Sequence, residues 1–470
     1  MVYSSAGQIA GILPSNTPLG AGTMTVRFNG SVAATGDVNV VAHSFGIFTI
    51  NQQGIGPAVA TDPLAGAAVY STINSAAPGD FIDIWGTGLG AVGYPDDGPT
   101  QPGTLAYDVK VYISGQEQAV EYADRSGCCT AVDLVRVKAP NIIGCFLPVV
   151  VVVNGIPSNY ASISIDPSGT ACTADPTFGG PDFSQLQSGG TVDIGSIFFT
   201  RSRISIDIDV VGPQATFDQT TDAAGASYAR VTLPDANAVR AFAPQGINQI
   251  GACTVFRFTG ESAQYPQLVA PVPLDAGPQL SLDGPGGAEV MTKNGPGSYA
   301  ASFVPDFPFL NPEGQDQFPV FPTYFEPGLT TVMAPGGADV GAHSASIVVP
   351  QDFEWLNKPA ANAVINRNNG FPVNYNATGY DYVNIFGYSA TMVGQDTIGA
   401  GFFCAASAAA GSFTIPAAVL QSLPQSQLTQ GFPLGFLTVG GYVTDTFNSA
   451  DLDVRTIVYA DSSVVTVNYN

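Results

Sequence analysis

The chain has 470 residues, and its 37 acidic and 14 basic side chains give a formal net charge of −23. Charged residues make up only 11% of it, against about 25% in an average soluble domain, which argues against a coiled coil, a helical bundle or a disordered linker. The negative charge repels phosphate backbones and argues against nucleic acid as a partner. Glycine (54) and proline (36) are abundant instead, as is typical of short strands and tight turns.

An internal repeat opens the chain. Segments of a first copy recur in a second, and the Asn-Gly steps at Asn29 and Asn154 give the offset of 125 residues (154 − 29). Each copy predicts a strand, a proline-containing turn, a second strand, an Asn-Gly hairpin turn and a third strand. The repeated segments are 8–14 and 23–30 in the first copy, and 133–140 and 149–155 in the second.

The second copy is complete, whereas the first is not. Residues 65–165 contain about seven short strand patterns, the number expected of an immunoglobulin-like sandwich. Residues 1–58 match only the second half of that module, because they lack a counterpart of 67–118. Half a sandwich exposes an apolar face and unpaired strand edges, so we expect the missing strands to come from a longer polypeptide or from a partner molecule.

The rest of the chain predicts further β-structure. Residues 166–185 are rich in Pro, Gly, Asp and Ser and are expected to be a linker. Period-two alternation predicts a β-sandwich over 186–350, with a Pro/Phe-rich insertion that cannot be a central strand, and a C-terminal β-sandwich over 351–470. The predicted fold class is therefore all-β, with tandem immunoglobulin-like β-sandwiches of which the first is incomplete at its N-terminal side.

The complete module resembles a known family, the Solibacter-type uncharacterised C-terminal domain, which is found in exported acidobacterial proteins, often in tandem. The motifs that carry the resemblance are 80–90, 127–129, 133, 144–145, 148–155 and 158–159. It is most specific over 65–165, extends to 1–58 and is loose beyond residue 170. The resemblance implies secretion and an immunoglobulin-like fold, and it brings no catalytic residues.

Six irregularly spaced cysteines favour disulfides in an exported protein over a zinc site, since the chain has no CxxC pairs and only two histidines. The favoured arrangement links one member of the Cys128–Cys129 pair to Cys145 and the other to Cys172. A vicinal bridge between Cys128 and Cys129 is the alternative. The two remaining cysteines are available for each other or for partners; they are Cys253 and Cys404.

The sequence offers little for catalysis or cofactor binding, so we expect no enzyme activity. Gly88–Gly93 matches the dinucleotide motif GxGxxG, but Tyr94–Pro99 follows it and cannot form the helix that this motif needs. A glycine-rich loop at the end of a sandwich is the better interpretation. His43 and His343 occupy similar strand-flanking contexts, and each is interpreted as structural rather than as a general base.

Acidic residues suggest candidate sites at four places in the sequence. Two pairs, each two residues apart on a predicted strand, share one face, as glycosidase carboxylates must, although a solvated face is favoured. The pairs are Asp207 with Asp209 and Asp451 with Asp453. Loop carboxylates are low-weight candidate ligands for calcium, without an EF-hand to support them: Asp96, Asp97 and Asp283. No catalytic, cofactor-binding or metal-binding residue is assigned.

Aromatic and asparagine side chains are candidates for glycan contacts or glycan sites. Trp85 and Trp355 are aromatic platforms on which a sugar could stack, as are Tyr380 and Tyr382. Two asparagines begin glycosylation-type triplets, which is weak support for exposure: Asn29 and Asn376.

No membrane span is expected, because the longest apolar stretch, Phe146–Val153, has eight residues and a spanning helix needs roughly 20. The first thirty residues have no basic region followed by an apolar one, so no signal peptide is expected within the chain. If the protein is exported, its targeting segment has been removed or lay upstream of residue 1. The cysteines favour an extracellular or cell-surface location.

These features predict a non-enzymatic exported structural or adhesive protein. We expect a subunit of a cell-surface or extracellular filament that assembles by β-strand complementation, with a neighbouring subunit completing residues 1–58. The alternative is a module of a larger secreted protein that binds carbohydrate or cell-wall polymer. A hydrolase that uses a carboxylate pair is the least favoured function.

Overall fold

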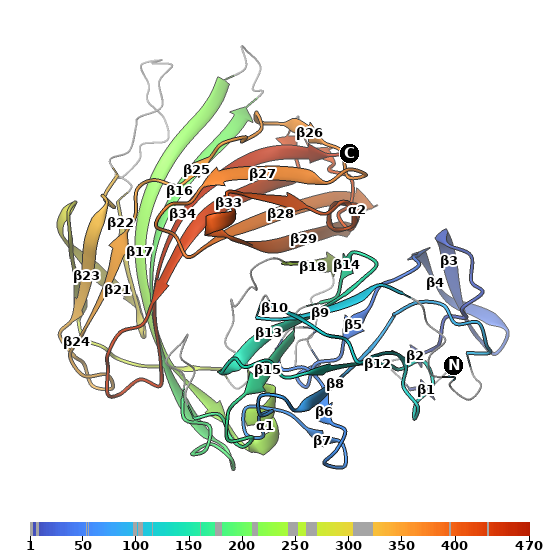
Figure 1. Ribbon diagram of the computed structural model, residues 1–470. Helices are drawn as coiled ribbons and strands as arrows, with labels where there is room; N and C mark the ends of the chain where they lie inside the picture. The colour runs from blue at the N-terminus through green and yellow to red at the C-terminus, as the bar shows by residue number, and fades with distance from the viewer. Residues whose placement is uncertain are drawn as a thin grey trace. The chain divides into compact units, whose positions relative to one another are not determined.

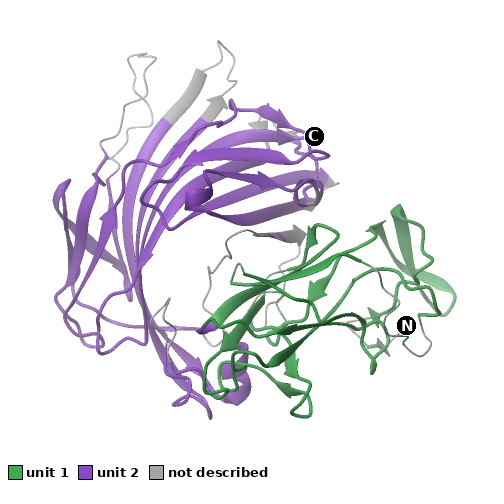
Figure 2. Ribbon diagram, in the orientation of Figure 1, with its two compact units in different colours: residues 1–142, 146–170 green, residues 143–145, 171–470 purple. Residues whose placement is uncertain are grey.

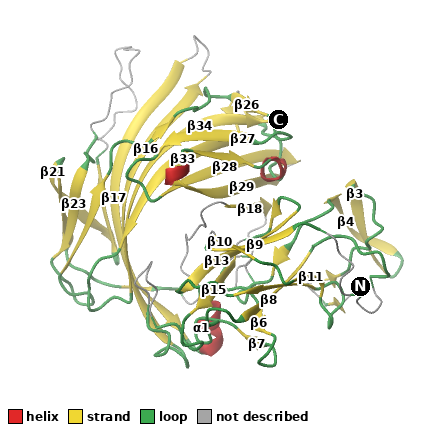
Figure 3. Ribbon diagram, viewed as in Figure 1, coloured by secondary structure: helices red, strands yellow, loops and turns green. Residues whose placement is uncertain are grey.

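A computed structural model shows that strands dominate the described parts of the chain (Figures 1 and 3). Those parts are residues 3–5, 9–52, 54, 56–96, 101, 107–114, 116–159, 161–173, 181–208, 215–242, 252–259, 270–303, 323–393, 396–429 and 432–470. Within them, the α-helices are α1 (Ala236–Ala241) and α2 (Ala417–Gln421). No helix of the described residues has the length and apolar character needed to cross a membrane.

The chain forms two compact units (Figure 2). The first contains residues 1–142 and 146–170, and the second contains 143–145 and 171–470. The strands of the first are β1 (Tyr3–Ser4), β2 (Ile9–Ala10), β3 (Gly20–Phe28), β4 (Ser31–Val40), β5 (Gly46–Ile47), β6 (Ala60–Asp62), β7 (Ala68–Val69), β8 (Phe81–Thr87), β9 (Val109–Ile113), β10 (Gln116–Gln118), β11 (Tyr122–Arg125), β12 (Asp133–Lys138), β13 (Gly144–Val153), β14 (Ile156–Pro157) and β15 (Ala161–Ile165).

A two-layer sandwich forms the body of the first unit. One sheet has the order β10-β9-β13-β14, with β15 also on β13, and the other has the order β11-β12-β8-β6-β7, with β5 also on β8. Alternate residues of β13, such as Val149 and Val151, share one core with Ile82 and Ile84 of β8. The predicted all-β fold class is confirmed, and the body of this unit is a two-layer sandwich.

The complete sandwich begins earlier in the chain than the sequence indicated. Phe45, Ile47 and Ala58 belong to its buried core, and β5 pairs with β8, so the expected boundary at residue 58 is wrong. The reason is visible in the repeat, because an offset of 125 carries residue 45 to residue 170, where the first unit ends. Residues after about 44 therefore belong to the following sandwich, and the half-domain is confined to the residues before them.

The repeat itself is preserved in three dimensions. Asn29 and Gly30 have φ values of 49° and 82°, and Asn154 and Gly155 have 47° and 81°. Both central residues thus lie in the left-handed region, as the tight hairpin turn favoured by Asn-Gly requires. In both hairpins the residue before Asn pairs with the residue after Gly.

The second unit is also all-β. Its strands are β16 (Gly190–Ile208), β17 (Ala215–Leu233), β18 (Ala252–Thr259), β19 (Val272–Pro273), β20 (Gln279–Gly284), β21 (Gly287–Gly295), β22 (Ser298–Ser302), β23 (Gly328–Ala334), β24 (His343–Val349), β25 (Glu354–Trp355), β26 (Ala363–Ile365), β27 (Phe371–Asn376), β28 (Tyr382–Val393), β29 (Asp396–Ser407), β30 (Ser412–Ile415), β31 (Leu428–Thr429), β32 (Phe432–Pro433), β33 (Gly435–Asp445) and β34 (Val454–Tyr469).

One sheet of fourteen strands runs through this unit, and a three-stranded sheet of β25, β27 and β30 shares its core. Strand β16 pairs in parallel with β34, from Ile194 opposite Val454 onward. The expected division into separate sandwiches over 186–350 and 351–470 is therefore wrong, because one sheet takes strands from both. Most of the expected Pro/Phe-rich insertion lies outside the described residues, and the described part of the expected linker contains no strand before β16.

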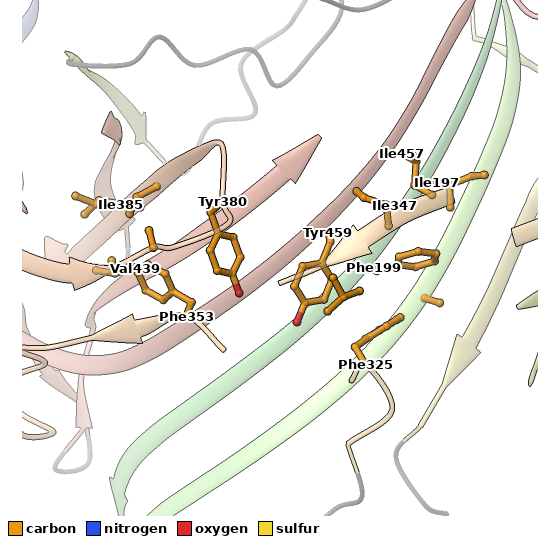
Figure 4. Close-up of a cluster of buried hydrophobic side chains, with 14 of the residues drawn as sticks. Ile197, Phe199, Phe325, Ile347, Phe353, Tyr380, Ile385, Val439, Ile457 and Tyr459 are labelled. Atoms are coloured by element: carbon orange, nitrogen blue, oxygen red, sulfur yellow. The ribbon is translucent and has the colours of Figure 1, made fainter. Parts of the chain in front are cut away.

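The large sheet folds over its own face. Strand β24 packs against β33 and β34, and Figure 4 shows Ile347 of β24 beside Ile197 of β16 and Ile457 of β34. Aromatic side chains also belong to this core, among them Tyr459 and Phe325. A single continuous core explains why the unit does not divide at residue 350.

A buried ion pair fastens a loop to the long strands of this core. The Arg201 guanidinium donates to both carboxylate oxygens of Asp222 at 2.9 Å. Asp222 also accepts from the backbone N–H groups of Tyr324 and Phe325, at 2.6 and 2.9 Å. These contacts satisfy a charge that would otherwise be costly to bury.

Candidate functional site

All six cysteines are paired, but not in the favoured arrangement. The bridges are Cys128–Cys129, Cys145–Cys172 and Cys253–Cys404. A bridge from the Cys128–Cys129 pair to Cys145 fails because the pair precedes β12 and Cys145 follows it. A six-residue strand is about 20 Å long, and bridged Cα atoms lie within about 7 Å. The vicinal alternative is therefore the one that forms.

The two histidines have structural contacts on both ring nitrogens. His43 Nδ1 lies 2.7 Å from the Leu89 carbonyl oxygen and must donate to it, so Nε2 accepts from Asn154 Nδ2 at 2.8 Å. His343 repeats the arrangement: Nδ1 donates to the Gly341 carbonyl oxygen at 3.0 Å, and Nε2 is hydrogen-bonded to the Tyr228 hydroxyl at 3.0 Å. Each ring nitrogen thus has a hydrogen-bond partner within the fold.

The glycine-rich segment beginning at Gly88 is a packed loop, and no helix begins between it and Asp96. The Leu89 N–H donates to Asp133 at 2.8 Å, and Arg125, which pairs with Asp133, donates to the Gly90 carbonyl oxygen at 2.8 Å. The motif therefore serves the end of the sandwich, as the sequence indicated, since side chains from β11 and β12 hold it.

The candidate carboxylates have separate structural roles. Asp451 and Asp453 lie in the turn before β34 rather than on a strand, and they accept backbone N–H groups from Gly341 and Asp193, each at 2.8 Å. Asp209 and Asp97 lie outside the described residues, as does the side chain of Asp207. Within the described residues, no three metal-ligating side chains form a group that could hold an ion.

The aromatic residues proposed for glycan stacking are mostly covered. Trp355 and Tyr380 are each only 7% exposed, and both belong to the core of the second unit. Trp85 is half-buried, and its indole N–H donates to the Thr61 hydroxyl at 2.8 Å. The prediction of exposed rings at Trp355 and Tyr380 is wrong. Trp355 is on the face of β25 that points into the core, and the turn after β27 directs Tyr380 into the same core.

The two candidate glycan-site asparagines are exposed. Asn29 occupies the hairpin turn, and Asn376 donates to Glu354 at 2.9 Å. Asn376 lies at a hollow of about 360 Å³ between the turn after β27 and residues 408–411, and its Oδ1 accepts from the Thr378 hydroxyl at 2.9 Å.

A row of aromatic rings, which the sequence interpretation did not identify, crosses three strands of the second unit. The Phe386 ring lies 4.5 Å from Phe403 and 5.4 Å from Phe436, and Tyr388 lies 5.2 Å from Phe436, measured between ring centroids. These residues alternate with core residues such as Ile385, so they occupy the opposite face of the sheet. Such rows stabilise neighbouring strands and can also stack on planar ligands.

The hairpin β3–β4 presents an apolar face to solvent. On β3, Met24 is 57% exposed and Phe28 is 72% exposed, with the half-buried Val26 between them. Val38 and Val40 of β4 share this face. The opposite face carries mainly polar side chains: Thr23, Thr25, Arg27, Thr35, Asp37 and Asn39. The hairpin therefore has the two-faced pattern of a strand pair that covers a core.

The same face is buried in the complete copy. With the offset of 125, its positions correspond as Met24 to Val149, Val26 to Val151, Phe28 to Val153, Gly36 to Ala161, Val38 to Ile163 and Val40 to Ile165. All six counterparts belong to the sandwich core and are at most 4% exposed. The first copy thus exposes residues at the positions that form the core of its repeat.

The first copy also lacks neighbouring strands. In the complete copy, β13 pairs with β9 along one edge, and β12 pairs with β8. Within the described residues, β3 pairs only with β4, and β2 pairs only with β1. Ser15 lies in the turn between β2 and β3, and its backbone N–H and hydroxyl donate to the Asp96 carboxylate at 2.7 and 2.6 Å. In the described part of the chain, the half-domain is thus fastened at one turn while its strand edges and apolar face are free.

Comparison with known proteins adds no family. No family model matches the chain, and no curated protein matches it. Three solved structures illustrate the remaining similarity, each with 9% identity. The Yersinia pseudotuberculosis InvD structure has a TM-score of 0.14, with 83% of this chain and 95% of that chain covered. Sidekick-1 immunoglobulin domains 1–5 give 0.13, with 94% and 83% covered, and Drosophila OTK extracellular domains 3–5 give 0.11, with 84% and 96% covered. TM-scores this low carry no argument about fold or function.

Proposed function

We propose that this protein is a non-enzymatic, exported structural or adhesive protein whose subunits assemble by β-strand complementation at the β3–β4 hairpin. The observation that carries the proposal is the exposed apolar face of Met24, Val26 and Phe28, whose counterparts lie in a core. In the assembly, a neighbouring subunit supplies the strands that the first copy lacks, and repetition of this contact builds a cell-surface or extracellular filament.

Covering this face contributes favourably to the free energy of association. Full burial of a Met, Val or Phe side chain contributes about 1.5–3 kcal/mol. Met24 and Phe28 still expose 57% and 72% of their surface, so covering these two alone contributes roughly 2–4 kcal/mol. Backbone hydrogen bonds to the free edge of β3 add to this.

Two observations support an extracellular location. All three cysteine pairs are disulfides, which persist in oxidising compartments. The resemblance of residues 65–165 to the Solibacter-type domain implies secretion. A low density of charge also suits a protein that packs against its own copies, because few ionic groups must be desolvated.

The assembly is tested on the purified native protein by electron microscopy and sedimentation velocity across a range of concentrations. We expect filaments, or oligomers that grow with concentration, and we expect the double variant Met24→Ser/Phe28→Ser to remain monomeric. Thr23→Ser/Thr25→Ser, on the polar face, is the matched control and retains assembly. A native protein that stays monomeric at high concentration contradicts the proposal.

A second candidate function is binding of a carbohydrate polymer, which the aromatic row of Phe386, Phe403, Phe436 and Tyr388 favours. Aromatic rings in a row can stack on successive sugar rings. A polysaccharide pull-down tests this: Phe403→Ala removes the ring that is 37% exposed and should weaken retention. Unchanged retention excludes the row as the binding surface.

A further inference from the structure

The strand that fills the free edge of β3 can be derived from the complete copy. There, β9 lies antiparallel along β13, with Ile113 opposite Val149, Val111 opposite Val151 and Val109 opposite Val153. Residues that face each other across an antiparallel pair project from the same face of the sheet. The three apolar residues of β9 therefore extend the same core that the valines of β13 line, and Val111 and Ile113 are fully buried in it.

The alternate residues of β9 are polar and turn away from the core. The Lys110 ammonium lies 3.5 Å from the Glu117 carboxylate, and the Tyr112 hydroxyl donates to the same carboxylate at 3.2 Å. The strand along β13 therefore follows a strict order of apolar, polar, apolar, polar and apolar residues. One face of this strand completes a core, and the other stays in water.

Because the two copies are equivalent, the same strand pairing is expected at the first copy. Met24, Val26 and Phe28 stand where Val149, Val151 and Val153 stand, and the two hairpins share the same Asn-Gly turn geometry. Irregular pairing in the β3–β4 hairpin does not disturb the free edge, because the extra residue lies in β4, between the partners of Val26 and Arg27. The outer edge of β3 thus keeps the regular alternation that an added strand needs.

We propose that the free edge of β3 accepts a strand of a neighbouring subunit in antiparallel orientation, with apolar side chains opposite Met24, Val26 and Phe28 and polar ones between them. This inference rests on the proposed function for the source of the strand, and it adds the acceptor edge, the direction and the register. A shift of one residue would turn every apolar side chain of the added strand to the wrong face, so the register is strongly specified.

The probe is a synthetic peptide of residues 107–118, which carries the β9 pattern, with a fluorophore at its N-terminus. Its binding to the full chain is measured by fluorescence anisotropy on the monomeric fraction from size-exclusion chromatography. The control peptide replaces Val109, Val111 and Ile113 with serine. We expect the control to bind at least about tenfold more weakly, since it loses the apolar surface at all three positions.

Register is tested with a photoreactive benzophenone residue in place of Val111 and mass spectrometry of the cross-linked product. We expect cross-links at Val26 and its immediate neighbours on the apolar face. The protein variant Val26→Thr should weaken peptide binding, and Val151→Thr, in the complete copy, should leave it unchanged. Thr25→Ser, on the polar face of β3, is a second control and should also leave binding unchanged.

Three results overturn the inference: equal binding of both peptides, cross-links confined to β4, or cross-links centred on the polar face at Thr25. Failure of the proposed function has a different signature. Peptide binding in the stated register to a native protein that never assembles supports the acceptor edge and contradicts the filament. Assembly of the native protein without peptide binding at β3 supports association and overturns the edge.

Discussion

Two matched substitutions, Val26→Thr and Val151→Thr, compare equivalent positions of the repeat. One position is only partly covered in the first copy, and the other is buried in the core of the second. The two valines occupy equivalent sites of the repeat, but Val151 is completely buried and Val26 is half-buried. Replacing valine with threonine keeps the shape and adds a hydroxyl, and burying an unpaired hydroxyl costs about 1–3 kcal/mol.

The expected magnitudes follow from this burial. Val151→Thr should lower the melting temperature of the first unit by roughly 2–12 °C, because 1 kcal/mol corresponds to about 2–4 °C for a domain of this size. Val26→Thr should change the free energy of unfolding of the monomer by no more than about 0.5 kcal/mol, so its melting temperature should shift only slightly. In the assembly, however, Val26 is buried, so its variant should weaken association by roughly 5- to 150-fold.

Differential scanning calorimetry of the monomeric fraction gives the two melting temperatures, and sedimentation velocity gives the association constants. Equal destabilisation of the monomer by both variants would show that Val26 is already covered in the free chain. Unchanged association of Val26→Thr would show that no core forms over the hairpin. Either result refutes the reasoning from the repeat.

Three further predictions concern an ion pair, a disulfide and a carboxylate of the second unit. Asp222→Asn removes the buried carboxylate partner of Arg201 and should cost about 1–3 kcal/mol in urea unfolding, since Arg201 keeps its ion pair with the exposed Asp352. Replacing both cysteines of the β18–β29 disulfide with serine should cost about 2–4 kcal/mol, seen as a lower calorimetric melting temperature. Hydrogen bonds from Lys293 and from backbone N–H groups lower the pKa of Asp275 to about 2. Because this pKa lies below the ordinary value, the associated stability is present above about pH 4 and is lost as the pH falls towards 2. Lys293→Met should raise the pKa of Asp275 in an NMR titration and reduce that loss.

The sequence by itself determined what depends on local pattern. Alternation of apolar and polar residues predicted strands throughout, and the two Asn-Gly steps predicted hairpin turns that the structure confirms at Asn29 and Asn154. The offset between them was enough to align the first copy with the second. That alignment alone matched the first copy to only the second half of the module.

Only the tertiary structure decided which distant segments meet. Alternation says which side chains share a face, but it does not say which strand lies alongside, so the pairing of Ile194 with Val454 had no local signal. The burial of Trp355 and the bridge between Cys253 and Cys404 have the same origin. Each depends on the path of strands far apart in the chain, and that path is set by how a whole core closes rather than by any short stretch of residues.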